Sequence, residues 1–430
     1  MHRRGNAAGA RSDVIRPQER RRYVLVPLLS GVRVLELTSV VMGPFAGQIL
    51  SDLGADTIKV EPLDGDVGRQ AQPGAEAGMG AMYVNNNRNK RVIALDLKST
   101  EGKKVMDRLL AWSEVFLHNM RMDAIDRLGL TFAHAVQVNP QLIYCSVLGF
   151  GQGGRYRGRP AFDDVIQAAC GLAGLSRQFG DEPRFIPTII ADKVGALYAV
   201  YGVLAALLSR ARGNHSAINV EAPMYEALVS FLLNEHLADA TFTAGQDAIG
   251  YGRIFDVNRR PHRTKDGWIA VLPYTTEQWT RFFLAVGNTE LVAQAWFTDA
   301  AERNRRLGFL YREVAAALAE RGTQEWMDLM LELDIPCSEV KDLNDLLSDP
   351  HLQDIDFFTP QGNYPPGILR ALPQPVLFGG VEKRPDNAAP ALGQDSRGVL
   401  RMCGYDDAEI DRLVGNGIVK ESSVADPVPR

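Results

Sequence analysis

Hydrophobic residues follow two alternating patterns along the first half of the chain. Short runs rich in Val, Ile and Leu predict buried strands, and longer stretches with helical periodicity predict helices between them. The predicted strands are residues 31–38, 56–61, 91–97, 114–118, 141–147 and 217–222. The predicted helices are residues 44–53, 100–111, 132–138, 165–175, 196–210 and 224–240. This alternation is typical of an α/β fold built around a parallel sheet.

The second half of the chain has a different pattern. Weak periodicity over residues 241–258 indicates a connection between two domains, and a hairpin-type turn at 265–267 precedes a predicted strand at 268–272. Prolines gather after about Pro350, which indicates that the chain crosses back at that point. Further helices are predicted at residues 277–285, 303–321, 323–332, 393–403 and 406–414.

The predicted helix 196–210 is apolar on nearly every side, so we expect it to be buried. Asp192 stands just before this helix, and Asp is a preferred N-cap residue. Free backbone N–H groups and the helix dipole keep a carboxylate ionised at such a position. An ionised carboxylate can cap the helix, and it can also act as a nucleophile. Asp163 and Asp164 are expected to cap the helix 165–175 in the same way.

Composition narrows the class of protein. The 430 residues are 46% hydrophobic and 23% charged, which is typical of a soluble protein of two or three domains. A net charge of −5 argues against nucleic acid as the main partner. The four scattered cysteines show no metal-ligand spacing, so we expect no metal site and a cytoplasmic location.

The chain also lacks several familiar segments. No apolar run looks long enough to span a membrane, so no membrane partner is expected. The first 22 residues are rich in arginine without the apolar core of a secretory signal, which predicts a disordered leader, with an Arg-rich transit peptide as the alternative. No G-x-G-x-x-G motif follows a predicted strand, so a dinucleotide cofactor is not expected.

Basic and amide side chains gather near several predicted strand ends. They are found in the stretch 85–91 and at Lys98, Asn119, Arg121 and Arg127. Ligands of open α/β sheets dock at strand ends, so these side chains could hold phosphates. Taken without further context, these residues are more simply explained as an ordinary solvated basic loop. The glycine-rich stretch 149–154 lacks the Lys-Ser/Thr pair of a phosphate loop and is expected to be a turn or hinge.

Taken together, these features resemble the family III CoA-transferases, the group that includes formyl-CoA transferase and the carnitine enzyme of the CaiB/BaiF type. The resemblance runs from about Pro27 to Val419 and rests on the order and spacing of many short motifs. The motifs are residues 31–38, 43–44, 52–56, 58–61, 89–91, 96–98, 101–102, 126–129, 139–140, 191–193 and 404–405.

The resemblance implies a fold and an assembly. We expect a large Rossmann-like domain, a smaller α+β domain and two subunits interlocked as a homodimer. The expected boundaries are a leader at 1–27, a large domain at 28–225 and 350–420, a linker at 226–261, a small domain at 262–349 and a loose tail at 421–430.

The resemblance also implies a chemistry. The family's nucleophile is an aspartate, which falls on Asp192, and a second acid falls on Asp163. CoA moves from an acyl-CoA to a carboxylic acid through mixed anhydrides and an aspartyl-CoA thioester. CoA is thus a substrate, and no permanently bound cofactor is expected. The residues expected to contact CoA or to flank the site are Val40, Val41, Leu95, Lys98, Asn119, Arg127 and Met224.

The chain differs from two related kinds of enzyme at positions that bear on its substrate and on its reaction. Val41 and Pro62 stand where formyl-CoA transferase has a glutamine and an arginine, which favours a bulkier acyl group than formyl. The related α-methylacyl-CoA racemases place a histidine where this chain has Phe162. A racemase would therefore need another base, such as His118, His236 or His262. A CoA-binding protein without activity is the third alternative, and the intact Asp192 argues against it.

Overall fold

The computed structural model describes residues 27–71, 74, 77–242, 249–360, 370–379, 381 and 387–422. Apart from Pro27, the predicted leader lies outside these residues, as does the predicted tail beyond Ser422. Part of the predicted linker, residues 243–248, also lies outside them.

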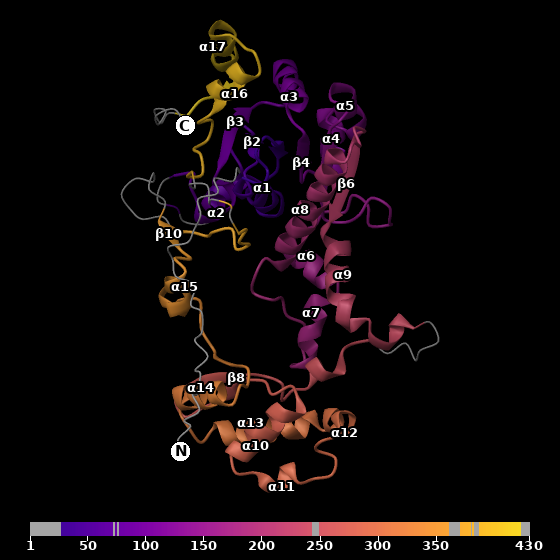
Figure 1. The fold of residues 1–430 in the computed structure, drawn as a ribbon. Coiled ribbons are helices and arrows are strands. Elements are labelled where there is room, and N and C mark those ends of the chain that lie inside the picture. Colours follow the sequence, from indigo (N-terminus) through magenta and orange to yellow (C-terminus); the bar gives the residue numbers. More distant parts are fainter. Residues whose placement is uncertain are drawn as a thin grey trace, which may run out of the picture.

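A seven-stranded sheet forms the centre of the larger part of the molecule (Figure 1). Its order is β12 (Val419–Lys420), β3 (Lys90–Leu95), β2 (Asp56–Glu61), β1 (Arg33–Leu37), β4 (Val115–His118), β5 (Ile143–Leu148) and β6 (Ile218–Pro223). Six strands are parallel, and β12 pairs antiparallel with β3. The predicted α/β class with a parallel sheet is confirmed. The strand order reverses between β1 and β4, and ligands of such sheets commonly bind at this reversal point.

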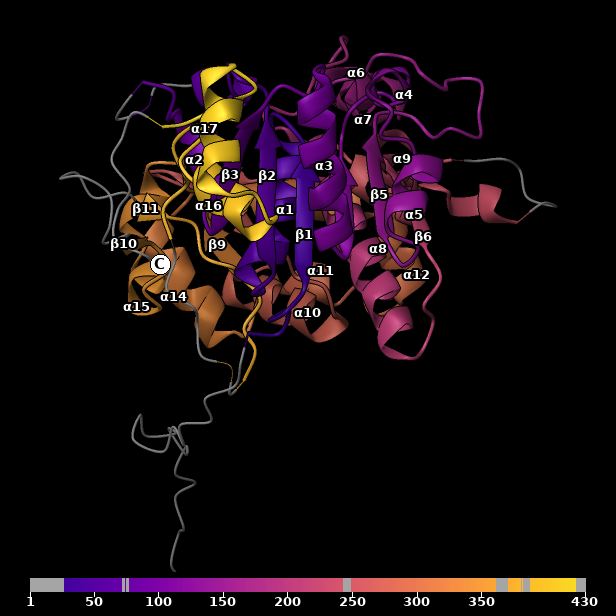
Figure 2. The same cartoon turned by 90° about the horizontal axis from the view of Figure 1, so that it is seen from above.

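Helices cover both faces of this sheet, as Figures 1 and 2 show. One face carries α1 (Met42–Asp52), α6 (Asp163–Ala169), α7 (Leu172–Leu175), α8 (Ile190–Ala211) and α9 (Met224–His236). The other carries α3 (Thr100–Trp112), α4 (Met122–Leu128), α5 (Phe132–Val138), α16 (Ser396–Met402) and α17 (Asp407–Gly415). Each face has its own hydrophobic cluster. Burial on both faces explains why β4 and β5 are almost continuous apolar runs.

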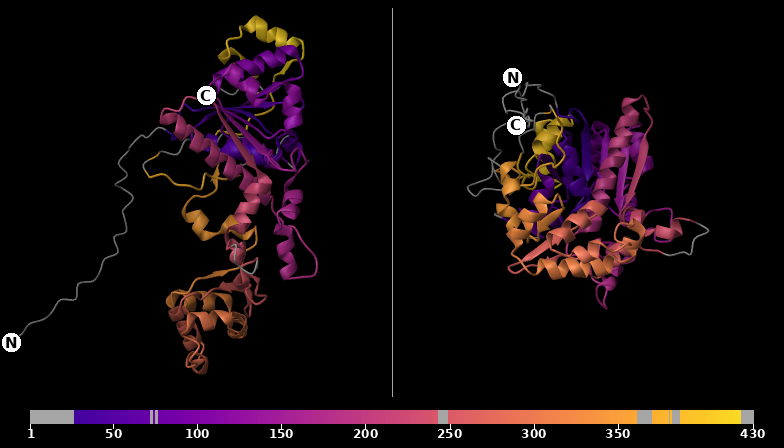
Figure 3. Two further views of the ribbon diagram at one scale, coloured as in Figure 1. Left: turned by 90° about the vertical axis from the view of Figure 1, so that its right-hand side faces the viewer. Right: turned by 60° about the horizontal axis from the view of Figure 1, so that its bottom comes forward.

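A second group of elements lies away from the seven-stranded sheet, at the bottom of Figure 1 and of the left view in Figure 3. The antiparallel strands β7 (His262–Arg263), β8 (Trp268–Val271) and β9 (Cys337–Glu339) form its sheet. Its helices are α10 (Thr276–Ala285), α11 (Thr289–Val292), α12 (Ala300–Arg305), α13 (Leu307–Leu318) and α14 (Thr323–Glu332). They enclose a separate aromatic core that contains Trp279, Phe282 and Trp326. The domain boundaries and the interlocked dimer stay predictions.

Shorter elements connect these parts. They are η2 (Val67–Gln70), α2 (Ala81–Asn87), η3 (Ser176–Gln178), η4 (Ala238–Thr241), η5 (Gly252–Phe255), η6 (Asp345–Ser348), α15 (Pro350–Asp354), β10 (Thr359–Pro360) and β11 (Arg370–Ala371).

Two long predicted helices are broken. The helix 165–175 divides at Gly171, whose φ of +95° interrupts a right-handed helix, and the helix 303–321 divides at Arg306.

Helix α8 differs from its prediction in length and in burial. It begins at Ile190 rather than at 196 and runs for 22 residues. Leu197, Tyr201 and Leu208 are 53%, 59% and 52% exposed, so one face of the helix is not buried. In the part of the chain that is described, α8 is the one helix long and apolar enough to span a membrane, contrary to expectation. Its other faces pack against α1, α9, β5 and β6, and this packing accounts for much of its apolar composition.

Candidate active site

The predicted site residues gather at one edge of the parallel sheet. Each follows the carboxyl end of a strand, and parallel strands place those ends at the same edge. In strand order, these are Val40 and Val41 after β1, Leu95 and Lys98 at and after β3, Asn119 and Arg127 after β4, Asp163 after β5, and Met224 after β6. The first turn of α8, which contains Asp192, packs beside them.

Asp163, and not Asp192, caps helix α8. Its Oδ2 accepts hydrogen bonds from the backbone N–H groups of Ala191 at 2.6 Å and Asp192 at 3.1 Å. The N-cap position itself is Ile189, whose side chain makes no capping bond. The predicted capping role of Asp192 is therefore wrong, because a carboxylate from another helix already accepts from these N–H groups.

The predicted capping of α6 by Asp163 and Asp164 is wrong as well. Both residues lie inside the first turn of α6, and its N-cap is Phe162. The side chain of Asp163 is turned away from its own helix terminus, toward α8.

Gln167 holds Asp163 in place and was missed by the sequence analysis. The side chain is fully buried, and its Nε2 donates to Asp163 Oδ1 at 2.6 Å. Its Oε1 accepts from the backbone N–H of Ile186 at 2.9 Å, and its Nε2 also lies 3.3 Å from the carbonyl of Thr188. Gln167 thus ties Asp163 to the segment that enters α8. The four-residue spacing from Asp163, which places both side chains on one helix face, was the available clue.

The carboxylate of Asp192 is partly buried and unpaired. It makes no hydrogen bond or ion pair with any residue that the structure describes, and only its backbone N–H is bonded. Burial, together with the negative charge of Asp163, raises the pKa of Asp192 from 3.8 to about 7. A carboxylate of this basicity is a stronger nucleophile than an ordinary one, and it is still largely ionised slightly above neutral pH.

Gly195 brings two predicted site regions against the helix of Asp192. A Cβ atom at Gly195 would lie 2.9 Å from Met42 Sδ and 3.0 Å from Met224 Cγ, so both methionine side chains lie directly against the glycine. Met42 directly follows Val41, and both Met42 and Met224 are buried. The first turns of α1 and α9 therefore meet α8 one turn after Asp192.

The other predicted CoA contacts fall into two groups. Leu95 is buried, and the Asn119 amide is already bonded to the backbone N–H and C=O of Ser39, at 3.0 and 2.8 Å. Lys98 is exposed, and Arg127 is 68% exposed and paired with Asp123 at 3.0 Å. The two cations are accessible to a ligand, whereas Asn119 has a structural task in addition to any contact with CoA.

The basic stretch 85–91 is not a free phosphate-binding loop. Asn85, Asn86 and Asn87 belong to α2, and Lys90 opens β3. The buried Lys90 ammonium lies 2.8 Å from Glu36, and Arg88 is paired with Asp52. These charges stabilise the interior, where a buried cation requires an anionic partner.

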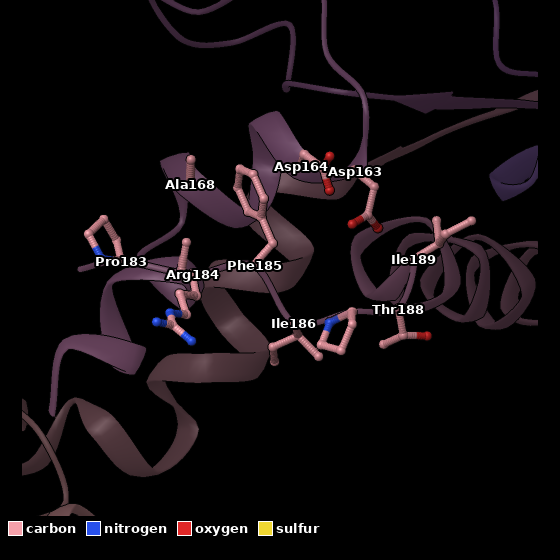
Figure 4. A pocket seen from close by; sticks show the side chains of 11 residues that line it. Asp163, Asp164, Ala168, Pro183, Arg184, Phe185, Ile186, Thr188 and Ile189 are labelled. Atoms are coloured by element: carbon pink, nitrogen blue, oxygen red, sulfur yellow. The ribbon is translucent and has the colours of Figure 1, made fainter. Parts of the chain in front are cut away.

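A cavity of about 690 Å³ lies beside Asp163 (Figure 4). It is lined by Asp163, Asp164, Ala168, Ala173 and the segment 183–189. Asp163 and Ile189 lie at one end of the cavity, and Pro183 and Arg184 at the other (Figure 4). Most of the wall is apolar, and the end at Ile189 adjoins the first turn of α8.

The histidines that could serve a racemase have other surroundings. His118 is buried, with its Nε2 2.9 Å from Ser146 Oγ, and burial lowers its pKa to about 3. His236 accepts from the backbone N–H of Tyr251 and stacks on Phe255. His262 lies in β7, outside the seven-stranded sheet. Among the described residues, no group of three or more His, Cys, Asp or Glu could hold a metal ion.

Comparison with known proteins shows the family to which the chain belongs. The model of CoA-transferase family III matches residues 29–396, so the chain belongs to this family. It is 26% identical to (R)-2-hydroxy-4-methylpentanoate CoA-transferase of Clostridioides difficile, over 91% of this chain and 100% of the relative. It is 27% identical to succinyl-CoA:glutarate CoA-transferase of Mus musculus, over 91% of this chain and 90% of the relative.

Solved structures agree with this assignment. A CaiB/BaiF family protein from Brucella suis superimposes with a TM-score of 0.74 at 26% identity, covering 87% of this chain and 99% of that one. The expected family and the expected enzyme class are thereby confirmed.

Proposed function

We propose that this enzyme transfers CoA from an acyl-CoA donor to a carboxylic acid, with Asp192 as the nucleophile. The observation that carries the proposal is the Asp192 carboxylate, which is unpaired, has a pKa of about 7 and lies at the carboxyl edge of the sheet. Asp163 acts as the second acid of the site by holding the first turn of α8 and by raising the pKa of Asp192.

The reaction proceeds in four balanced steps. The Asp192 carboxylate attacks the thioester carbonyl, releases CoA thiolate and forms a mixed anhydride. The thiolate attacks the aspartyl carbonyl and releases the donor acid, which leaves an aspartyl-CoA thioester. The acceptor carboxylate attacks this thioester, releases the thiolate and forms a second anhydride. The thiolate finally attacks the acceptor's carbonyl, which gives the new acyl-CoA and regenerates Asp192.

We propose that the cavity beside Asp163 takes the carbon chain of the acid. Its volume and apolar wall suit a chain larger than formate or oxalate. Buried Val41, where formyl-CoA transferase has a glutamine, supports the same conclusion. The acids named in the two relatives above, 2-hydroxy-4-methylpentanoate and glutarate, are likewise larger than formate.

A homodimer and a cytoplasmic location complete the proposal. Leu197, Tyr201 and Leu208 form an exposed apolar stripe at helical spacing on α8, which a second subunit would cover. The mass in solution, measured by sedimentation equilibrium against the 47.3 kDa of one chain, tests the dimer.

The proposed function is tested by an exchange screen. Acyl-CoA donors are incubated with free carboxylic acids, and new acyl-CoA species are followed by mass spectrometry. We expect exchange with acids that carry apolar chains, and slower exchange with formate and oxalate. A parallel incubation of one 2-methylacyl-CoA epimer in deuterated water should show no deuterium at the α-carbon. Absence of exchange with every pair, or rapid deuterium uptake, would contradict a transferase.

Arg127→Ala should weaken acyl-CoA binding. Arg127 is accessible, and a guanidinium can bind a diphosphate through two N–H groups. Loss of one such contact should raise the KM for acyl-CoA by about 10- to 100-fold and leave the acceptor's KM nearly unchanged. Arg305→Ala is the matched control, because Arg305 in α12 is also an exposed arginine that is paired with an acid on its own helix, Glu302. Equal KM values in both variants would remove Arg127 from the CoA site.

A further inference from the structure

Val40 has a strained backbone. It connects β1 to α1 with a φ of +70°, in the left-handed region that β-branched residues avoid. The other non-glycine residues with positive φ in the described part of the chain are Asn89, Ala238, Asp334 and Asp356, none of which is β-branched. Such a conformation persists only where the surroundings impose it.

The Asp66 carboxylate holds this conformation from the side of β2. Asp66 Oδ1 accepts from the backbone N–H groups of Val40 at 3.1 Å and of Gly68 at 2.8 Å. Asp66 Oδ2 accepts from Lys59 Nζ at 2.7 Å. Asp66 is 4% exposed and Lys59 is fully buried, so the carboxylate is fixed by an ion pair that water does not weaken.

Asn119 holds the preceding residue from the side of β4. Its amide bonds both the N–H and the C=O of Ser39. The short connection Ser39–Val41 is thus held by side chains that follow both neighbours of β1 in the sheet. The connection has little freedom to relax the strain at Val40.

The conformation of Val40 determines how α1 begins. Val41 and Met42 follow directly, and the Met42 sulfur lies where Gly195 has no side chain, one turn after Asp192. We propose that Asp66 is a positioning residue that keeps Val40 left-handed and so sets the first turn of α1 against the nucleophile helix. The inference rests on the proposed function, because Val40 and Val41 are the residues expected to flank bound CoA.

Two substitutions of Val40 separate a positioning role of Asp66 from a general stabilising role. Glycine adopts a φ of +70° freely, whereas alanine removes the Val40 side chain and still disfavours that conformation. Asp66→Asn is therefore prepared in wild type, in Val40→Gly and in Val40→Ala. The dissociation constant of free CoA is measured for all six proteins by titration calorimetry, together with their melting temperatures.

We expect Asp66→Asn to weaken CoA binding by about tenfold with Val40 or with Val40→Ala, and by less than about threefold with Val40→Gly. Equal losses in all three backgrounds would overturn the inference, because a general structural role does not depend on φ at residue 40. Val40→Gly alone should also melt at a higher temperature than Val40→Ala. This comparison can overturn the inference even if Asp66→Asn does not fold, because equal melting temperatures would mean that Val40 holds no strain.

The wild-type titration distinguishes this inference from the function on which it rests. A wild type that does not bind CoA would overturn the proposed function and the inference together. A wild type that binds CoA, with Asp66→Asn effects that are the same in every background, would overturn the inference alone.

Discussion

Asp192→Asn should melt at a higher temperature than the wild type at pH 8 and yet lose turnover by about three orders of magnitude or more. The pKa of Asp192 is raised from 3.8 to about 7 in the folded protein. Between pH 3.8 and about 7, the Asp192 carboxyl group is ionised in the unfolded chain and protonated in the folded protein. Stability therefore falls as pH rises through this window, and above it the ionised carboxylate destabilises the fold by on the order of 4 kcal/mol at most.

An amide at this position removes that destabilisation and cannot form an anhydride. The melting temperatures of the Asp192→Asn variant and the wild type should converge at about pH 4. At that pH the folded wild type carries a protonated, neutral Asp192, and the variant carries a neutral amide. Glu101→Gln is the matched control, since Glu101 is an exposed acid in the first turn of α3. It should change neither the turnover nor the pH dependence of melting. An Asp192→Asn protein that turns over like the wild type would exclude Asp192 as the nucleophile.

Asp163→Ala should lower stability by about 2–4 kcal/mol and abolish most activity. It leaves the N–H groups of Ala191 and Asp192 without their acceptor, and it removes a hydrogen-bond partner of the buried Gln167. Denaturant unfolding at pH 7 measures the loss. Asp164→Ala, at the exposed neighbour, should cost much less stability. Equal losses for the two variants would contradict the capping role of Asp163.

Asp163→Asn separates the capping role from the charge. An amide oxygen still accepts one hydrogen bond, so the variant should be more stable than Asp163→Ala. The negative charge of Asp163 raises the pKa of Asp192, and its removal lowers that pKa. Activity that requires ionised Asp192 should rise with pH through a midpoint near 7 in the wild type and at a lower pH in Asp163→Asn. An unchanged midpoint in the pH dependence of kcat/KM would show that the two carboxylates are not coupled.

Local sequence patterns predicted most of the larger sheet. Strand β2 and helices α5 and α14 have the predicted bounds, because each has a clear apolar period and clear end residues. Strands β9 and β12 have only three and two residues, which is too short for any period to show. They exist because they pair with strands far away in the chain.

Charged residues were harder to assign from the sequence. The stretch 85–91 has the composition of a solvated loop, yet Lys90 and Asn87 are fully buried. What makes the burial of Lys90 favourable is Glu36, which lies in a strand 54 positions earlier and pairs with the Lys90 ammonium in the folded protein. Composition alone does not show whether such a partner is present.

Local sequence patterns and motifs were enough to predict the α/β class, the family and the aspartate that stands at the start of the most apolar helix. The carboxylate that caps this helix could not be predicted from the sequence, because it depends on how α6 packs against α8. The N–H groups of Ala191 and Asp192 donate to whichever carboxylate lies within hydrogen-bond distance, and folding brings Asp163 there from 28 residues earlier in the chain. The pKa of Asp192 was decided in the same way, because burial and the charge of Asp163 exist only once α6 and α8 have packed together.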